Sequence, residues 1–344
     1  MANTVTLVSK PVGPIGYGLM GLTWRPQPQP AEESYKAMST AFEHGATFWN
    51  GGELYGKPDR HSCHLLNEYF THHPEQADKI VLSIKGGLVA GQMQPDGSAK
   101  NVRRSVEDCL KILNGTKTID IFECARVDHN VPIETTIKAL AELVKEGKIG
   151  GIGLSEVKAS TIGRAAAIHP IAAVEVELSL WSTDILRNGV AETCAKLGIP
   201  IVAYSPLGRG ALAGENIIRK NSDLPEGDMR RHYPKYQDDA LEHNNQIVEE
   251  VAKLAKEKGV TRGQIALAWV RGLSGRTITN EDGQELKLGT IIPIPGATRP
   301  ERVVENSKIV DLSDAEMKEI ADILKKNPVK GDRYPKAGMA HVEG

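Results

Sequence analysis

Short β-rich runs alternate with helical stretches along most of the chain, and this alternation limits the fold more than any other sequence feature. The segments between the runs carry apolar residues at helical spacing, so each can cover a sheet with one apolar stripe. Two clear examples are Ile133, Ile137, Leu140 and Val144, and Leu186, Val190, Cys194 and Leu197. We predict eight strands, at residues 15–20, 47–50, 80–84, 119–123, 150–154, 172–176, 200–204 and 290–294.

Repeated strand–helix–strand units connect with one hand, so they form either an open doubly wound sheet or a closed barrel. The Gly-x-Gly-x-x-Gly run at residues 16–21 begins inside the first predicted strand, so no such turn follows that strand. Polar, Tyr, Lys and Ser residues cluster just past the strand ends along the whole chain, and a barrel collects such residues at one mouth. We therefore predict one α/β domain over residues 1–344, a (β/α)₈ TIM barrel of eight parallel strands with its cofactor and active site at the carboxyl-terminal face.

Composition excludes several classes of protein. The chain has 344 residues, a formal net charge of −2 and no broad basic face, which argues against nucleic acid and anionic membrane as partners. No apolar run approaches the roughly 20 residues of a membrane-spanning helix. The four cysteines are dispersed singly, as reduced thiols are. We expect a soluble cytoplasmic protein, monomeric or weakly homo-oligomeric, that acts on a small molecule.

Two strand ends carry residues suited to proton transfer. The predicted strand ending at Asn50 leads into a glycine-flexed loop that presents Tyr55, and a second apolar strand ends in Lys85. A tyrosine at the mouth can donate a proton, and a nearby ammonium lowers the pKa of a phenol because it favours the phenolate. On these segments alone, a tyrosine that packs its ring with its hydroxyl in water, and a surface lysine, remain open alternatives.

The resemblance to a known family becomes specific when the motifs are read in order. They are residues 16–21 (GYGLMG), the 50–56 loop (NGGELYG), Lys85, residues 153–155 (GLS), residues 203–210 (AYSPLGRG) and residues 294–302 (IPGATRPER) with Glu305-Asn306. Together they resemble the aldo-keto reductases, from about residue 11 to residue 325. Residues 8–16, 22–26 and 124–129 are most similar to the fungal pyridoxal reductase type.

The resemblance implies a role for each matching residue in an NADPH-dependent reaction. Tyr55 would be the general acid, Lys85 would tune it, and Asn50 would complete the contact. Ser155 and Glu175 would hold the nicotinamide carboxamide, and Tyr204 would stack on the ring. The other implied cofactor residues are Arg299 and Arg302 at the 2′-phosphate, Glu305 and Asn306 at adenine, and Ser205, Leu207, Arg209, Gly296 and Thr298; the implied substrate pocket holds Trp24, Ala125 and Arg126.

NADPH is favoured over NADH by the segment that begins at Pro295-Gly296. A glycine-rich turn that enters a helix exposes free backbone N–H groups, and nearby guanidinium groups suit a dianion. Taken without the family, Tyr204 could be core filler, Ser155 a turn residue, and Arg299 and Arg302 ordinary solvated residues.

The sequence departs from the family pattern at four positions. Asn50 stands where the family has Asp, and Ala125 stands where it has His, so half of the usual catalytic tetrad is changed. Glu175 replaces a Gln and Glu156 replaces an Asn. Because Asn50 offers no charge, we expect Lys85 to be held less firmly as an ammonium, while Ala125 removes a donor to the carbonyl oxygen.

The reaction predicted from these residues is reduction of an aldehyde to an alcohol. Within the resemblance, pyridoxal to pyridoxine is the favoured reaction, with pyridoxine oxidation as its reverse. The alternatives are a generic aldehyde or ketone reductase and a non-catalytic NADPH-binding regulatory barrel. The run from His61 to His64 offers three potential metal ligands, but no distant Cys/His pair completes a set, so we expect no metal.

Overall fold

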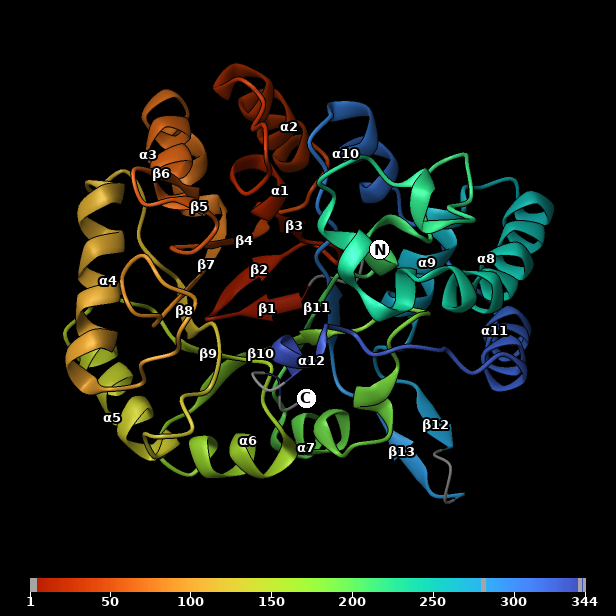
Figure 1. Ribbon diagram of the computed structural model, residues 1–344. Helices are drawn as coiled ribbons and strands as arrows, with labels where there is room; N and C mark the ends of the chain where they lie inside the picture. Colours follow the sequence, from red (N-terminus) through yellow and green to blue (C-terminus); the bar gives the residue numbers. More distant parts are fainter. Residues whose placement is uncertain (1–4, 280–282, 340–341, 343–344) are drawn as a thin grey trace.

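The computed structural model describes residues 5–279, 283–339 and 342, and shows a closed barrel of eight parallel strands (Figure 1). Backbone N–H groups of Gly16 and Gly18 donate to the carbonyl oxygens of Pro293 (2.9 Å) and Pro295 (3.2 Å), which joins the last strand to the first. The predicted (β/α)₈ barrel is confirmed. The strands, in order around the barrel, are β3 (Tyr17–Gly18), β4 (Phe48–Gly52), β7 (Val81–Gly86), β8 (Ile121–Cys124), β9 (Ile152–Ser155), β10 (Ile171–Glu177), β11 (Ile201–Tyr204) and β14 (Ile291–Pro293).

Helices surround the strands as an outer ring, seen in Figure 1. The predicted helix around Ile137 is α5 (Ile133–Lys145). The predicted stripe ending at Leu197 lies on α7 (Val190–Leu197), but its first residue, Leu186, lies before that helix in the 3₁₀ turn η2 (Asp184–Leu186). The helices are α1 (Met20–Thr23), α2 (Ala31–Glu43), α3 (Ser62–His72), α4 (Ala99–Leu113), α5 (Ile133–Lys145), α6 (Ala159–Ala166), α7 (Val190–Leu197), α8 (Asp238–Lys258), α9 (Arg262–Gly272), α10 (Pro300–Ser307), α11 (Asp314–Lys326) and α12 (Lys336–Met339).

The first predicted strand is shorter than expected. It covers only Tyr17 and Gly18, because Met20 already begins α1. Before it, β1 (Val5–Leu7) and β2 (Lys10–Val12) form an antiparallel hairpin that the sequence did not reveal. Its turn places Val8 and Ser9 at positive φ (44° and 64°) without the Asn-Gly or Gly-Gly signal that such turns usually carry.

The strands divide the barrel interior into an apolar floor and a charged mouth. Successive side chains of a strand point to opposite faces, so residues two apart share the interior. The floor packs Leu7 and Val12 of the hairpin against inward residues of six strands, Phe48, Val81, Ile121, Ala173, Val202 and Ile292. One step towards the mouth, the same faces present Asn50, Ser83, Glu123 and Glu175, all of them buried.

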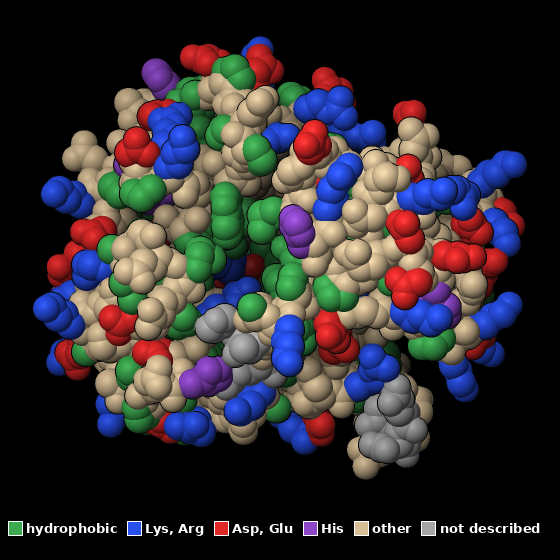
Figure 2. All heavy atoms as spheres, viewed as in Figure 1, with side chains coloured by type: hydrophobic (Ala, Val, Ile, Leu, Met, Phe, Trp, Pro, Cys, Tyr) green, Lys and Arg blue, Asp and Glu red, His purple; other side chains and the backbone are tan. Residues whose placement is uncertain are grey.

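Between β11 and α8 the chain makes four short 3₁₀ turns, η3 (Gly208–Gly210), η4 (Asn221–Asp223), η5 (Met229–His232) and η6 (Pro234–Tyr236). Smaller elements are η1 (Pro74–Lys79), the hairpin β5–β6 (Gly56–Lys57 and Arg60–His61) and the hairpin β12–β13 (Thr277–Thr279 and Glu285–Lys287). Figure 2 shows that the face viewed in Figure 1 is hollowed near its centre, with hydrophobic side chains around the hollow and charged ones deeper inside. Within the described ranges, no helix combines the length and apolar character needed to cross a bilayer.

Truncation of Leu7 tests the floor. Leu7 is 1% exposed in the floor cluster, so Leu7→Ala should lower the free energy of unfolding by about 2–4 kcal/mol. Thr6→Ala, on the exposed side of the same strand, should change it by less than about 0.5 kcal/mol. Chemical denaturation measures both, and equal effects of the two variants would contradict this account of the floor.

Candidate active site

Tyr55 and Lys85 meet at the mouth. Strand β4 ends at Gly52, and the chain then turns, with the Tyr55 N–H donating to the Gly52 carbonyl (3.2 Å). The Thr23 hydroxyl donates to the Tyr55 carbonyl (2.6 Å), and Trp24 stacks on the Tyr55 ring with centroids 5.6 Å apart. The Lys85 ammonium lies 5.8 Å from the centre of that ring. The structure therefore brings together the two residues that the sequence suggested for proton transfer.

Lys85 is surrounded by one amide and two carboxylates. Its Nζ donates to Asn50 Oδ1 (3.0 Å), lies 3.3 Å from Glu123 Oε1 and forms a shorter ion pair with Glu175 Oε1. Burial alone would lower the pKa of Lys85, but Glu123 and Glu175 raise it above its ordinary value. Our expectation that Asn50 leaves Lys85 less firmly protonated is therefore wrong, because two neighbouring strands supply the charge that Asn50 lacks.

Glu123 was missed by the sequence analysis. It lies on β8, beside Lys85 in the strand register, and also accepts from the Ser83 hydroxyl (3.2 Å). A signal was present: Ile121 and Glu123 share one face of a strand that is otherwise buried and apolar. An acidic residue on such a face needs a partner inside the barrel, since an unpaired buried charge is costly.

The protonation states of these groups favour proton donation by Tyr55. Burial raises the pKa of Tyr55 to about 12, although the Lys85 ammonium opposes this shift, so the hydroxyl keeps its proton at neutral pH. Burial also raises the pKa of Glu175, with Lys85 opposing the shift and Glu123 adding to it. The site thus holds an ammonium and a protonated phenol beside two buried glutamates.

Arg126 faces Tyr55 from the end of β8. Ala125 is buried, and the Arg126 guanidinium turns back to donate to the Ala125 carbonyl (2.6 Å). The guanidinium lies 5.9 Å from the Tyr334 ring centre, and its charge opposes the rise that burial causes in the pKa of Tyr55. The residue next to the missing histidine thus brings a positive charge to the mouth.

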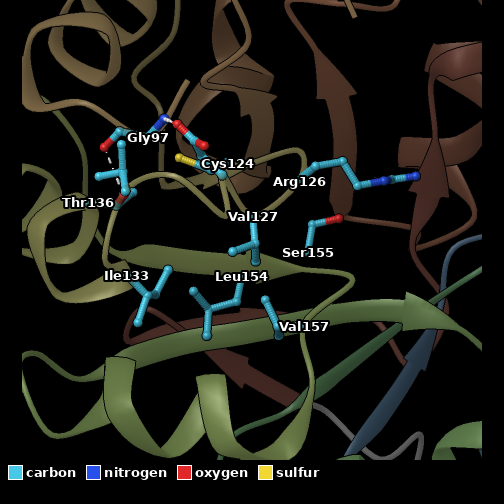
Figure 3. A pocket seen from close by; sticks show the side chains of 11 residues that line it. Gly97, Cys124, Arg126, Val127, Ile133, Thr136, Leu154, Ser155 and Val157 are labelled. Carbon is cyan, nitrogen blue, oxygen red and sulfur yellow. Dashed lines mark hydrogen bonds between the residues drawn. The ribbon is translucent and has the colours of Figure 1, made fainter. Parts of the chain in front are cut away.

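Ser155 has the features of a ligand-binding residue. It ends β9, it is 1% exposed, and its hydroxyl has no hydrogen-bond partner within the described part of the chain. Figure 3 shows its side chain extending to the same side as Arg126, away from Leu154 and Ile133. A buried hydroxyl without a partner pays a desolvation cost that a bound amide could relieve. Ser155 therefore fits the nicotinamide carboxamide, whereas Glu175, named for the same role, contacts Lys85 and Asn50.

The turn before α10 fits a phosphate. Gly296 and Arg299 are exposed, Thr298 is half-buried, and Arg299 is the residue that precedes the first turn of α10. Helix amino termini and guanidinium groups both favour anions. Arg302 is half-buried and pairs with Glu305, which also accepts from the Thr261 hydroxyl (2.8 Å). Asn306 is buried behind them. Arg302, Glu305 and Asn306 lie on α10, whereas Gly296, Thr298 and Arg299 lie in the turn before it.

The end of β11 lies beside the C-terminal segment that contains Arg333 and Tyr334, a contact that the sequence analysis did not predict. The Tyr204 hydroxyl lies 2.8 Å from the Tyr334 hydroxyl, so ring stacking of Tyr204 on nicotinamide would occur beside Tyr334. Arg209 pairs with Glu177 (2.9 Å) between the rings of Tyr233 and Tyr334. Ser205 and Arg209 both have positive φ (49° and 54°), and half-buried Leu207 lies between them.

Glu156 anchors this segment. It replaces the family asparagine at a position with φ of 54°, a region that asparagine tolerates better. Hydrogen bonds to its carboxylate compensate for this backbone strain. The carboxylate accepts from both terminal nitrogens of the Arg333 guanidinium (3.1 and 2.8 Å) and from the Glu177 N–H (3.1 Å). Both side chains are buried, so the pair fixes the segment around Tyr334 at the mouth.

The histidines at the start of α3 have a structural role. His61 Nδ1 accepts from the Cys63 N–H (3.3 Å), and His64 Nδ1 accepts from the His61 N–H (3.2 Å), which caps the helix. Burial, with His64 adding to it, lowers the pKa of His61 to about 4. No group of three or more metal-ligating side chains occurs within residues 5–279, 283–339 and 342.

Comparison with known proteins agrees with this geometry. The model of the aldo/keto reductase family matches residues 14–325. The chain belongs to the aldo/keto reductase family. It is 41% identical over 332 residues to the Schizosaccharomyces pombe protein named "Probable pyridoxal reductase 2", covering 94% of this chain and 95% of the relative. A Saccharomyces cerevisiae protein that also bears a pyridoxal reductase name is 38% identical, with 94% and 96% covered.

Solved structures of the family share the fold. A glycerol dehydrogenase from Gluconobacter oxydans gives a TM-score of 0.80 at 23% identity, with 97% of this chain and 99% of that chain covered. An aldo/keto reductase from Klebsiella pneumoniae, solved with NADP and acetate, gives 0.67 at 20%, with 97% and 99% covered. This aldo/keto reductase is an NADP(H)-dependent oxidoreductase.

Removal of the Ser155 hydroxyl separates cofactor binding from folding. Because the hydroxyl has no partner among the residues that the structure describes, Ser155→Ala should leave the free energy of unfolding within about 0.5 kcal/mol of the original. It should weaken NADPH binding about 3- to 10-fold, the value of one hydrogen bond. Calorimetric titration and denaturation give the two quantities.

Ser105→Ala is the matched control. The Ser105 hydroxyl is also buried, but it accepts from the Gly87 N–H (2.9 Å) and donates to Glu53. Its loss should destabilise the fold by about 1 kcal/mol and leave NADPH affinity unchanged. Unchanged NADPH affinity in Ser155→Ala would contradict the carboxamide role.

Proposed function

We propose that this aldo/keto reductase reduces pyridoxal to pyridoxine with NADPH, Tyr55 being the proton donor. The observation that carries the proposal is the approach of the Lys85 ammonium, held by buried carboxylates, to the Tyr55 ring at the barrel mouth. The names of the two fungal relatives support the choice of substrate.

The reaction is the sum of one hydride and one proton transfer. NADPH, when bound, supplies the hydride to the aldehyde carbon, and the aldehyde with NADPH and a proton gives the alcohol and NADP⁺. Tyr55 holds its proton at neutral pH and donates it to the substrate oxygen. Lys85 stabilises the phenolate that remains after donation, and the stacked Trp24 ring fixes the direction of the hydroxyl.

The 3-hydroxyl group of pyridoxal would compensate for the absence of the family histidine. Ala125 offers no donor to the carbonyl oxygen, but pyridoxal carries a phenolic hydroxyl beside its aldehyde. An internal hydrogen bond from this hydroxyl would take the place of the missing donor. Arg126, whose charge acts at Tyr55, would accommodate the negative charge that the substrate phenol develops.

Four residues at and just before α10 would select and hold the cofactor. Arg299 and Arg302 would select NADPH over NADH through the 2′-phosphate, and Glu305 and Asn306 would hold adenine.

Residues 1–344 would work as one domain, monomeric or weakly homo-oligomeric. A cytoplasmic location fits the four free cysteines. A generic aldehyde reductase is the second candidate, favoured by the family match itself.

Replacement of Tyr55 by Phe tests the proton donor. With pyridoxal as substrate, Tyr55→Phe should lower kcat at least about 100-fold, because it removes the general acid while keeping the ring that stacks on Trp24. Steady-state NADPH oxidation gives kcat, and fluorescence titration should give an unchanged Kd for NADPH. Absence of pyridoxal turnover in the original enzyme, with NADPH bound, would reject the substrate; undiminished turnover in Tyr55→Phe would reject the acid.

A pair of isomeric aldehydes tests substrate assistance. If an ortho hydroxyl replaces the missing histidine, 2-hydroxybenzaldehyde should show a kcat/KM about tenfold above that of 3-hydroxybenzaldehyde. The isomers have the same composition and similar size, so pocket volume does not distinguish them. An Ala125→His variant should reduce the difference by supplying a donor, and equal rates in the original enzyme would exclude the hypothesis.

A further inference from the structure

The polar groups around Lys85 come from three other strands. Asn50 on β4 uses both ends of its amide: Oδ1 accepts from Lys85, and Nδ2 donates to Glu175 (2.6 Å) and Glu123 (3.1 Å). Glu123 and Glu175 reach the same ammonium from β8 and β10. All four side chains are buried, with 2–3% exposure, so solvent contributes little to their balance.

We infer that Glu175 is a positioning residue that shares with Glu123 the counter-charge of Lys85, and that Asn50 must remain neutral because its amide joins this ammonium to both carboxylates. The inference rests on the proposed roles of Tyr55 and Lys85. The family aspartate at position 50 would place a negative charge on β4, whereas in this chain Glu175 places it on β10. Residues 50 and 175 are therefore a matched pair.

The number of carboxylates explains why Asn50 is matched to Glu175. An aspartate at 50 would place three carboxylates around one ammonium, and its oxygens would face those of Glu123 and Glu175 where the amide now donates. Like charges at such separation cannot all remain ionised in a buried site. A glutamine at 175 would leave Glu123 as the single carboxylate beside Lys85. Exchanging both residues restores two carboxylates and one amide.

The other charged and titratable groups near the cluster do not remove this requirement. Tyr55 faces Lys85 from the loop after β4, Arg126 faces Tyr55 from the end of β8, and the Cys124 thiol follows Glu123. Arg126 brings a second positive charge to Tyr55, but its hydrogen bond goes to the Ala125 carbonyl rather than to either glutamate. Lys85 is thus the cation that the two carboxylates contact.

The test is a double-mutant cycle of Asn50→Asp, Glu175→Gln and the double exchange. Each single variant should lower kcat at least about tenfold, whereas the double exchange should stay within about threefold of the original enzyme. In Glu175→Gln, the loss of kcat at alkaline pH should begin at a lower pH than in the original enzyme, because removing a carboxylate lowers the pKa of Lys85. The double exchange should reverse this shift. NADPH affinity should be unchanged in all three.

Thermal unfolding provides a readout that needs no substrate. In Asn50→Asp, the added carboxyl must keep a proton in the folded state, so the unfolding midpoint should fall further below the original at pH 9 than at pH 6. The double exchange should remove this difference. Asp120→Asn, a buried carboxylate that pairs with Lys10 and Lys117 near the amino ends of the strands, is the control and should leave the pH profile of kcat unchanged.

Several results would overturn the inference. In the double exchange, a loss equal to the product of the single losses would show that residues 50 and 175 do not act together. A weaker NADPH affinity in Glu175→Gln with an unchanged pH profile would assign Glu175 to the carboxamide instead. If the original enzyme reduces no aldehyde, the proposed function fails, and the unfolding cycle alone decides this inference: coupled midpoints support it and additive midpoints reject it.

Discussion

The buried ammonium of Lys85 is the interaction on which the rest of the site depends. A lysine inside a barrel is tolerated only when opposite charge and hydrogen-bond acceptors surround it, because removing an ammonium from water costs several kcal/mol. Strands β4, β8 and β10 provide Asn50, Glu123 and Glu175 for this purpose. The position and charge of Lys85 then determine the environment of Tyr55.

The mouth holds a second buried charged network with a different role. Glu156 and Glu177 hold Arg333 and Arg209, and these contacts fix the C-terminal segment and the turn after β11 around Tyr204. The first network surrounds Lys85 beside the proposed proton donor Tyr55, whereas the second shapes the surface beside the implied nicotinamide position. Both use residues two apart on β10, Glu175 and Glu177, so a single strand contributes to each.

The sequence predicted the fold well because its signals are local. Seven of the eight predicted strands overlap barrel strands of similar length, and the glycine motifs between them identify the family. The hairpin β1–β2 escaped because its turn lacks the usual glycine, and the C-terminal segment escaped because Arg333 binds Glu156, 177 positions earlier. Glu123 was left out because its partner also lies on another strand, although its place on a buried face was visible.

The sequence by itself determined the alternation of strands and helices, the residue types at the strand ends, and the loss of Asp and His at positions 50 and 125. Only the tertiary structure decided the charge of the site. Barrel closure brings β4, β7, β8 and β10 to one interior, where Glu123 and Glu175 replace the charge that Asn50 lacks. The pKa of a buried group depends on the charges within a few ångströms, and those neighbours are set by strand register rather than by position along the chain.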